Sequence, residues 1–155
     1  MYISETNKEQ PTNKETGTQK YTKATNVEKG AYILSDCEGE PQVILMGTGS
    51  EVHLLIEAQE KLKSESIRSR VVSFPSWELF DQQSNEYKEK VFPKKIRARL
   101  AVEAGSPLGW SKYITDDGDV IGINKFGESA PGEQVMKEYG FSVENVIAKA
   151  KALIK

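Results

Sequence analysis

The sequence contains one cysteine, one histidine and no long run of apolar residues. Cys37 has no second cysteine with which to form an internal disulfide, which suits a reducing compartment. Its thiol is predicted to be unreactive, because no neighbouring group in the sequence would stabilise a thiolate. No segment approaches the roughly 18 apolar residues of a membrane-spanning helix, and the first residues lack a secretory signal pattern. The sequence therefore predicts a cytoplasmic protein without a membrane partner.

The charged residues are balanced, with 21 basic and 23 acidic residues and a net charge of -2. Because the sequence has no basic patch or run, a nucleic-acid partner is not expected. His53 has no second ligand or nucleophile beside it, so it predicts neither a metal site nor a catalytic base. The acidic segment 116–119 resembles part of a calcium loop, but it lacks the glutamate at the twelfth position and is predicted to be a turn.

Residues 1–26 differ in composition from the rest of the chain. Their apolar residues are Met1, Tyr2, Ile3, Tyr21 and Ala24, and most of the others are Thr, Lys, Glu, Asn and Gln. Such a segment buries too little apolar surface to offset the entropy lost on ordering it. We therefore expect a disordered leader or linker over residues 1–26 and one folded domain over residues 27–155.

Short apolar runs alternate with helical patterns along the folded part. The expected strands are 31–35, 42–46, 67–74, 97–104 and 119–123, and the expected helices are 50–64, 77–81, 85–91, 110–114, 131–139 and a last helix from Ser142. This alternation predicts an α/β fold with a layered, mostly parallel sheet. The connection between the first two strands is too short for a parallel crossover, so the first strand is expected to run antiparallel or to lie at an edge.

The sharpest local motif is the turn Gly47, Thr48, Gly49 and Ser50, which lies between an expected strand and an expected helix. Free backbone N–H groups at such a turn can hold a phosphate, so these four residues are a candidate anion site. A dinucleotide fingerprint needs a third glycine where this chain has Val52. The favoured interpretation is structural, because Thr48 and Glu51 have the spacing of a helix capping box.

Four loops follow expected strands, at 47–50, 75–77, 105–109 and 124–131. The carboxyl ends of parallel strands meet at one edge of a sheet, where open α/β sheets bind ligands, so we expect these loops to converge. Aromatic residues flank them, namely Trp77, Phe80, Trp110, Tyr113 and Phe126. Packing beneath the loops is the favoured role for each aromatic ring, and the lining of a small pocket is the alternative.

Four sequence blocks, at 43–52, 70–80, 101–110 and 122–131, carry a resemblance to a known family. They begin with Val-Ile-Leu-Met-Gly-Thr-Gly-Ser-Glu-Val and end with Gly-Ile-Asn-Lys-Phe-Gly-Glu-Ser-Ala-Pro. In this order and spacing the blocks resemble the C-terminal domain of transketolase. The resemblance implies a three-layer sandwich around a five-stranded, mostly parallel mixed sheet. It also implies a parent enzyme that transfers a two-carbon ketol unit between sugar phosphates on thiamine diphosphate, in the pentose phosphate pathway.

The resemblance does not extend to the residues that perform the chemistry of the family. Thiamine enzymes hold the diphosphate and Mg²⁺ through a Gly-Asp-Gly followed by an Asn, and Asp117-Gly118-Asp119 is not that motif. No catalytic, cofactor-binding or metal residue is therefore predicted, and thiamine diphosphate and Mg²⁺ are expected only in the parent. The expected role is structural, with the upstream domains of the parent and its dimer mate as partners. The alternatives are the C-terminal subunit of a split thiamine enzyme and a regulatory module that binds phosphate or a nucleotide at Gly47–Ser50.

Overall fold

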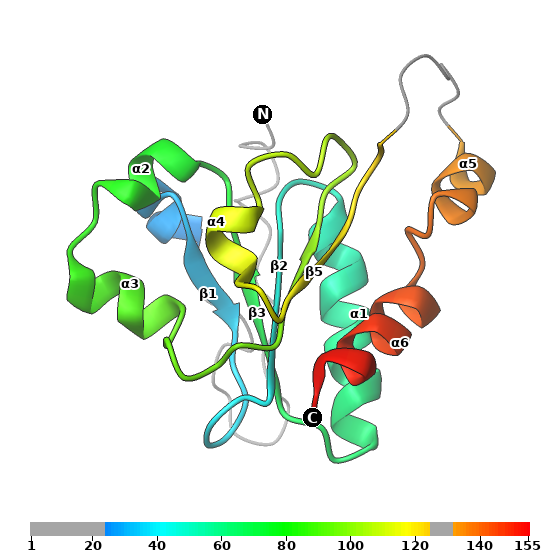
Figure 1. Ribbon diagram of the computed structural model, residues 1–155, viewed down its shortest axis with the longest axis horizontal. Coiled ribbons are helices and arrows are strands. Elements are labelled where there is room, and N and C mark those ends of the chain that lie inside the picture. The colour runs from blue at the N-terminus through cyan, green and yellow to red at the C-terminus, as the bar shows by residue number, and fades with distance from the viewer. Residues whose placement is uncertain (1–23, 125–131) are drawn as a thin grey trace.

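The structure is a computed structural model, which describes residues 24–124 and 132–155. Five strands form one mixed sheet in the order β1-β3-β2-β4-β5 (Figure 1). The strands are β1 (Tyr32–Ser35), β2 (Val43–Gly47), β3 (Ser69–Ser73), β4 (Arg99–Val102) and β5 (Asp119–Ile121). β2 pairs in parallel with β3 and β4, β4 pairs in parallel with β5, and β1 pairs antiparallel with β3 at an edge. The predicted sheet and the orientation of its first strand are confirmed.

The helices cover both faces of the sheet, which gives the three layers expected from the resemblance. Their bounds are α1 (Glu51–Ser64), α2 (Trp77–Asp81), α3 (Asn85–Val91), α4 (Ser111–Ile114), α5 (Glu133–Glu138), α6 (Val143–Leu153) and the 3₁₀-helix η2 (Ala24–Lys29). Figure 1 shows α1 and α6 on one side of the sheet and α2, α3 and α4 on the other. None of the helices in the described ranges is long and apolar enough to cross a membrane.

The central strand β2 explains how one sheet supports two apolar layers. All five of its residues are buried, and successive side chains point to opposite faces. Val43 and Leu45 join a buried cluster with α1 and α6, whereas Ile44 and Met46 join a second cluster with the aromatic residues beneath α2 and α4. A continuous apolar run is typical of a parallel strand that is covered on both faces.

The last helix begins as its sequence predicts. The side chain of Ser142 is the N-cap of α6 and accepts a hydrogen bond from the backbone N–H of Asn145 at 3.2 Å. Gly140, just past α5, has a φ of 87°, a left-handed conformation that favours glycine. Phe141, just before this cap, and Val146, in the first turn of α6, are both buried in the cluster between α6 and the sheet, as in a hydrophobic staple.

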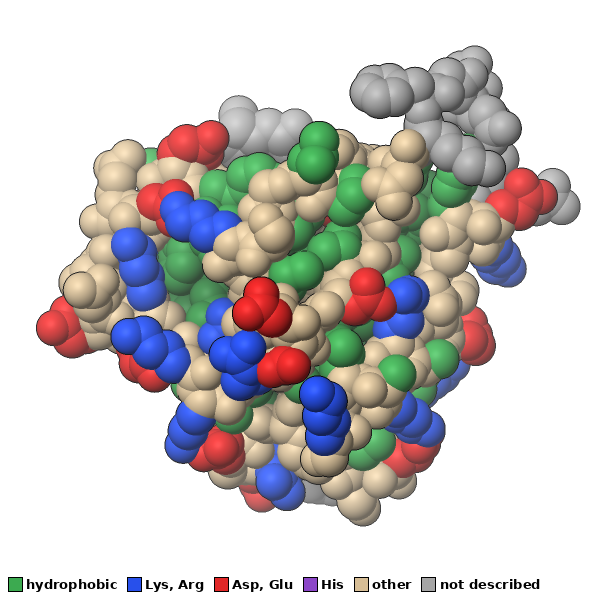
Figure 2. Space-filling model, in the orientation of Figure 1, with side chains coloured by type: hydrophobic (Ala, Val, Ile, Leu, Met, Phe, Trp, Pro, Cys, Tyr) green, Lys and Arg blue, Asp and Glu red, His purple; other side chains and the backbone are tan. Residues whose placement is uncertain are grey.

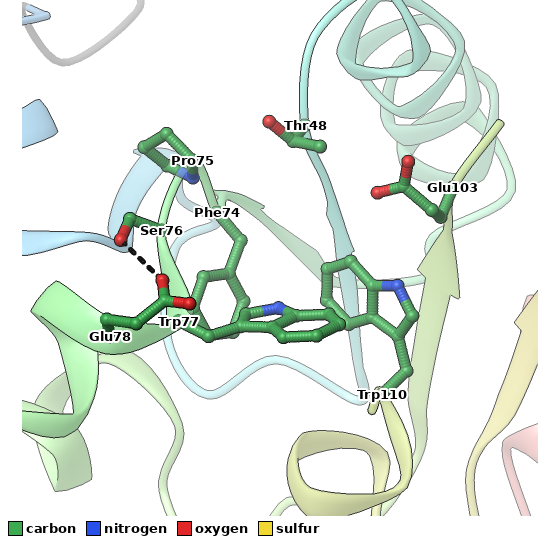
Figure 3. Close-up of a pocket in the computed structure, with 8 residues that line it drawn as sticks. All are labelled: Thr48, Phe74, Pro75, Ser76, Trp77, Glu78, Glu103 and Trp110. Carbon is green, nitrogen blue, oxygen red and sulfur yellow. Dashed lines mark hydrogen bonds between the residues drawn. The ribbon is translucent and has the colours of Figure 1, made fainter. Parts of the chain in front are cut away.

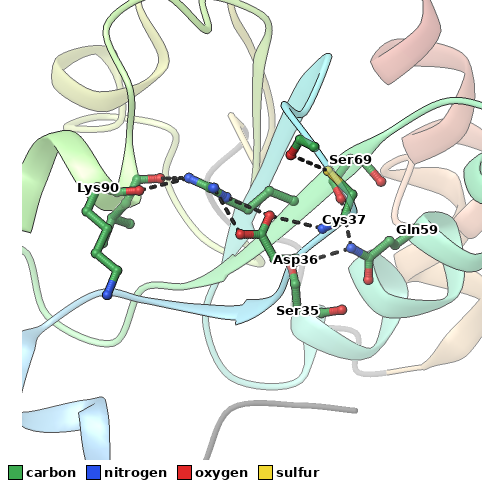
Figure 4. Close-up of polar contacts among 9 residues, drawn as sticks. Ser35, Asp36, Cys37, Gln59, Ser69 and Lys90 are labelled. Carbon is green, nitrogen blue, oxygen red and sulfur yellow. Dashed lines mark hydrogen bonds and ion pairs between the residues drawn. The ribbon is translucent and has the colours of Figure 1, made fainter. Parts of the chain in front are cut away.

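A buried arginine connects the segment after the edge strand β1 to the end of helix α3. Arg70 on β3 donates to both oxygens of Asp36, at 3.0 and 2.9 Å, and to the carbonyl oxygens of Lys90 and Val91 at 2.9 and 3.1 Å. Figure 4 shows Cys37 beside this network. Burial, and secondly the charge of Asp36, raise the pKa of the Cys37 thiol, which supports the prediction that it is unreactive.

The structure differs from the expectations at the ends of several elements. Residues 24–26, which we expected in the disordered leader, begin the 3₁₀-helix, and the rest of the expected leader lies outside the described residues. The helix expected over 131–139 extends over Glu133–Glu138, and Pro131 lies outside the described residues. Four of the five strands are shorter than expected and β2 is shifted by one residue, because pairing with neighbouring strands, which the sequence does not show, sets their ends.

Candidate functional site

The carboxyl ends of β2, β3 and β4 bring three of the four expected loops together. They surround a cavity of about 230 Å³ (Figure 3). The residues that line it are Thr48, Phe74, Pro75, Ser76, Trp77, Glu78, Glu103 and Trp110. Asn124 is the only residue of the fourth expected loop that the structure describes, because 125–131 lie outside the described residues. The predicted convergence is thus confirmed for the first three loops.

The turn after β2 has the expected backbone but not the expected cap. Gly49 has a φ of 61°, in the left-handed region, as a tight turn into a helix requires. The predicted capping box of Thr48 and Glu51 is wrong, because α1 begins only at Glu51 and its N-cap is Ser50, which makes no side-chain cap hydrogen bond. The Ser50 hydroxyl donates to Glu51 Oε1 at 2.9 Å instead, and Thr48 lines the cavity.

Two carboxylates lie beside this turn. Glu51 is buried, with 6% of its surface exposed, and the half-buried Glu103 lines the cavity. Burial, and secondly the charge of Glu51, raise the pKa of the Glu103 carboxyl. The candidate anion site at Gly47, Thr48, Gly49 and Ser50 stays a prediction, and these carboxylates would repel a phosphate held there. Glu103 was not among the predicted site residues, although an acidic residue directly after a buried strand is a usable signal.

Two tryptophans form the aromatic wall of the cavity. The rings of Trp77 and Trp110 are perpendicular, at 87°, with centroids 5.4 Å apart. Gly109 has a φ of 92°, and a Cβ there would lie 2.5 Å from Cζ3 of Trp77, so only glycine lets this ring lie against the loop. Trp110 is 1% exposed, and its Nε1–H has no hydrogen-bond partner among the described residues. Such an unpaired buried donor is uncommon in native proteins.

Phe80 and Tyr113 pack beneath the loops, which is the role that the sequence favoured for them. Phe80 and Tyr113 are 3% and 7% exposed, and both rings contact Phe74. The Tyr113 hydroxyl donates to Asp81 Oδ1 at 3.1 Å. Phe126 lies outside the described residues.

The remaining candidate residues lie away from the cavity. His53 is exposed on α1. Within the acidic segment 116–119, residues 116–118 lie in the predicted turn between α4 and β5, and Asp119 begins β5. In that turn Asp117 pairs with Arg97, which lowers the pKa of the Asp117 carboxyl. Figure 2 shows acidic and basic side chains interspersed over the visible face, in agreement with the balanced composition.

The described residues do not fit thiamine diphosphate or its metal ion. Within 24–124 and 132–155 no three His, Cys, Asp or Glu side chains are grouped so that they could hold a metal ion. The charged side chains that line the cavity, Glu78 and Glu103, are acidic and would oppose a diphosphate. No catalytic step is therefore assigned to this chain.

Comparison with known proteins gives consistent matches. A sequence model of the transketolase-like C-terminal domain matches residues 30–142. The transketolase of Halalkalibacterium halodurans is 52% identical over 129 residues, which are 83% of this chain and 19% of that protein. Transketolase 1 of Escherichia coli is 50% identical over 129 residues, which are 83% of this chain and 20% of that protein.

A solved structure agrees with these sequence matches. The transketolase from Leishmania mexicana superposes with a TM-score of 0.79 and 35% identity, over 89% of this chain and 20% of that chain. The chain thus spans about a fifth of the length of the relatives that it matches. The sequence match covers most of the folded part, and the fold agrees with it. The chain belongs to the transketolase-like C-terminal domain family.

Proposed function

We propose that this chain serves a transketolase as its C-terminal, assembly-supporting domain and performs no catalytic step itself. The observation that carries the proposal is the sequence match to proteins named transketolase. The match covers about a fifth of the length of each relative, and half or more of the aligned residues are identical. In the whole enzyme, thiamine diphosphate and Mg²⁺ would support the transfer of a two-carbon ketol unit between sugar phosphates. The upstream domains of the parent and its dimer mate would be the partners of this chain.

Cofactor binding tests the first part of the proposal. Calorimetric titration of the 155-residue chain with thiamine diphosphate and Mg²⁺ is expected to give no saturable heat, since the cavity is acidic and no described group of ligands suits a metal ion. Ketol transfer by the chain is expected to be undetectable under conditions in which a complete transketolase is active. A dissociation constant near 1 µM, about −8 kcal/mol, would overturn the proposal.

An exposed leucine offers a test of the assembly role. Leu108, in the loop between β4 and α4, is 81% exposed in this chain. Burial of this side chain against another domain of the parent would remove apolar surface from water. In the complete parent enzyme, Leu108→Ser is expected to weaken domain or dimer association in analytical ultracentrifugation. Lys63→Ser, at an exposed position on α1, is the matched control, and equal behaviour of the two variants would contradict a contact at Leu108.

The cellular location is part of the same proposal. A cytoplasmic location suits the single unpaired Cys37, and the pentose phosphate pathway is the expected pathway of the parent enzyme. The maize relative is named a chloroplastic transketolase, so the location varies among relatives. Fractionation of the source cells, with detection by an antibody against this chain, tests the location.

A further inference from the structure

We propose that the cavity at the carboxyl edge of the sheet binds a small amino alcohol. Its ammonium group would lie between the Glu103 carboxylate and the ring of Trp77, and its oxygen would accept the Nε1–H of Trp110. This binding activity goes beyond the assembly role proposed above and does not depend on it. Four kinds of observation carry it: the charge of the lining, its aromatic rings, one unpaired donor and the size of the cavity.

The charge of the lining selects a cation. Glu103 and Glu78 are the charged side chains that line the cavity, and no described Lys or Arg lines it. The buried Glu51 lies near enough to raise the pKa of Glu103 through its charge, so an added positive charge would relieve repulsion between two carboxylates. A charge-assisted hydrogen bond from an ammonium group to a carboxylate is about twice as strong as a neutral one.

The aromatic lining favours an organic cation over a hydrated metal ion. In Figure 3 the ring of Trp77 is seen nearly edge-on, with Thr48 above one of its faces. Gly109 lies against the six-membered part of this ring, and the ring of Trp110 is perpendicular to it. The face of a tryptophan ring attracts an ammonium group more strongly than any other side-chain ring does.

The unpaired indole donor supplies the second recognition element. Trp110 is 1% exposed, lines the cavity, and has no partner for its Nε1–H in the described part of the chain. Figure 3 shows this nitrogen on the side of the ring that faces Glu103. An indole N–H can only donate, so the complementary ligand atom is an acceptor such as a hydroxyl oxygen. A ligand that satisfies both groups therefore carries an ammonium group and an oxygen close together.

The cavity has room for such a molecule. Ethanolamine has four non-hydrogen atoms, and at about 30 Å³ for each, the share of one water molecule in the liquid, it needs about 120 Å³. The cavity measures about 230 Å³.

The test follows the indole N–H signals of the ¹⁵N-labelled 155-residue chain during titration with ethanolamine at about pH 8, where an ordinary carboxyl is ionised. The chain has two tryptophans and hence two such signals, and Trp77→Phe leaves only that of Trp110 for assignment. We expect a saturable shift of the Trp110 signal at millimolar ethanolamine. Glu103→Gln is expected to raise the dissociation constant about tenfold, through loss of a charged partner. Glu57→Gln, at an exposed position on α1, is expected to leave it unchanged.

Three further ligands test which chemical groups of ethanolamine the cavity recognises. Ethylene glycol lacks the ammonium group and ethylammonium lacks the oxygen, so each is expected to bind several-fold more weakly than ethanolamine. Inorganic phosphate is expected to cause no saturable shift. The proposal is overturned if ethanolamine gives no saturable shift, if ethylene glycol binds equally well, if Glu103→Gln binds like the wild type, or if phosphate binds instead. None of these results bears on the calorimetric test with thiamine diphosphate.

Discussion

At the scale of single residues, burial decides which charged groups matter in this domain. Glu103 follows strand β4 and Asp117 follows helix α4, yet the pKa values of these two carboxyl groups shift in opposite directions. Burial raises that of Glu103, whereas the hydrogen bond from Arg97 lowers that of Asp117. The two groups therefore make opposite contributions to the pH dependence of folding.

We expect Glu103→Gln to gain stability relative to the wild type as the pH rises. A raised pKa means that the folded state holds its proton more firmly than the unfolded state. The stability that Glu103 contributes is therefore complete below the unfolded pKa and is lost as the pH rises through the folded pKa. Urea unfolding across a pH series, starting below the ordinary value of 4.5, measures the difference. Asp117→Asn is expected to show the reverse trend, with its contribution lost as the pH falls, and parallel trends would contradict both assignments.

Arg99 is expected to be the most sensitive charged position in the sheet. It is 7% exposed and donates to the carbonyl oxygens of Ile96, Tyr113, Phe92 and Pro93. Arg99→Ala removes the guanidinium donor from these carbonyl groups. The Pro93 carbonyl keeps the N–H of Ile96, and each buried carbonyl left unpaired costs about 1–3 kcal/mol, so we expect a loss of at least about 3 kcal/mol in the free energy of unfolding.

The control for Arg99 is its neighbour Arg97. This exposed side chain makes an ion pair with Asp117, and pairs of this kind contribute little to stability. Arg97→Ala is therefore expected to change the urea midpoint far less than Arg99→Ala does. Similar midpoints for the two variants would show that the carbonyl contacts of Arg99 do not hold the fold.

At the scale of helices and strands, the sequence predicted which elements form along the chain better than it predicted the residues at which each element begins and ends. The positions of five strands along the chain and the antiparallel edge strand follow from apolar runs and one short connection, which are local properties, whereas the order of the strands in the sheet was not predicted. The start of α1 did not follow, because Thr48 and Glu51 match a capping box although the helix begins two residues later than that box requires. The cap of α6 was predicted correctly, since Ser142 is followed directly by an amphipathic segment.

Two cap variants separate these cases. Ser142→Ala removes a hydroxyl that accepts the N–H of Asn145, so we expect a loss of about 0.5–2 kcal/mol in the free energy of unfolding. Thr48→Ala removes a hydroxyl that caps no helix, so the expected loss is well below that of Ser142→Ala. Thermal melts of both variants against the wild type provide the measurement. A larger loss for Thr48→Ala would restore the capping box that the structure contradicts.

At the scale of the whole molecule, one sheet joins two apolar layers, and both tryptophans lie on the same side. Trp77 and Trp110 belong to or pack against the cluster of α2 and α4, whereas Leu45 points into the layer of α1 and α6. The convergence of three loops was predictable from the direction of parallel strands. The cavity was predictable only in part: Trp77 and Trp110 were named as possible pocket lining, whereas Glu103 was not, because the lining depends on side chains that meet only after folding.

Leu45→Ala tests whether the two layers unfold as one unit. The fully buried side chain is lost from the layer without tryptophan, so we expect a loss of about 2–5 kcal/mol. Tryptophan fluorescence and far-ultraviolet circular dichroism are expected to shift together, because small domains usually unfold in a single transition. An unchanged fluorescence midpoint beside a lowered dichroism midpoint would show that the layers separate.

The last residue of the chain lies at the edge of the sheet opposite the cavity. Lys155 Nζ is 3.5 Å from Oδ1 of Asp117, and Asp117 pairs with Arg97, just before β4 begins. Figure 1 shows the C-terminus far from the loops that follow β2 and β4. A biotinylated tail added after Lys155 would therefore attach the protein to a sensor chip with the cavity facing the flowing solution. The same geometry would let amines be screened by surface plasmon resonance without the anchor blocking the site.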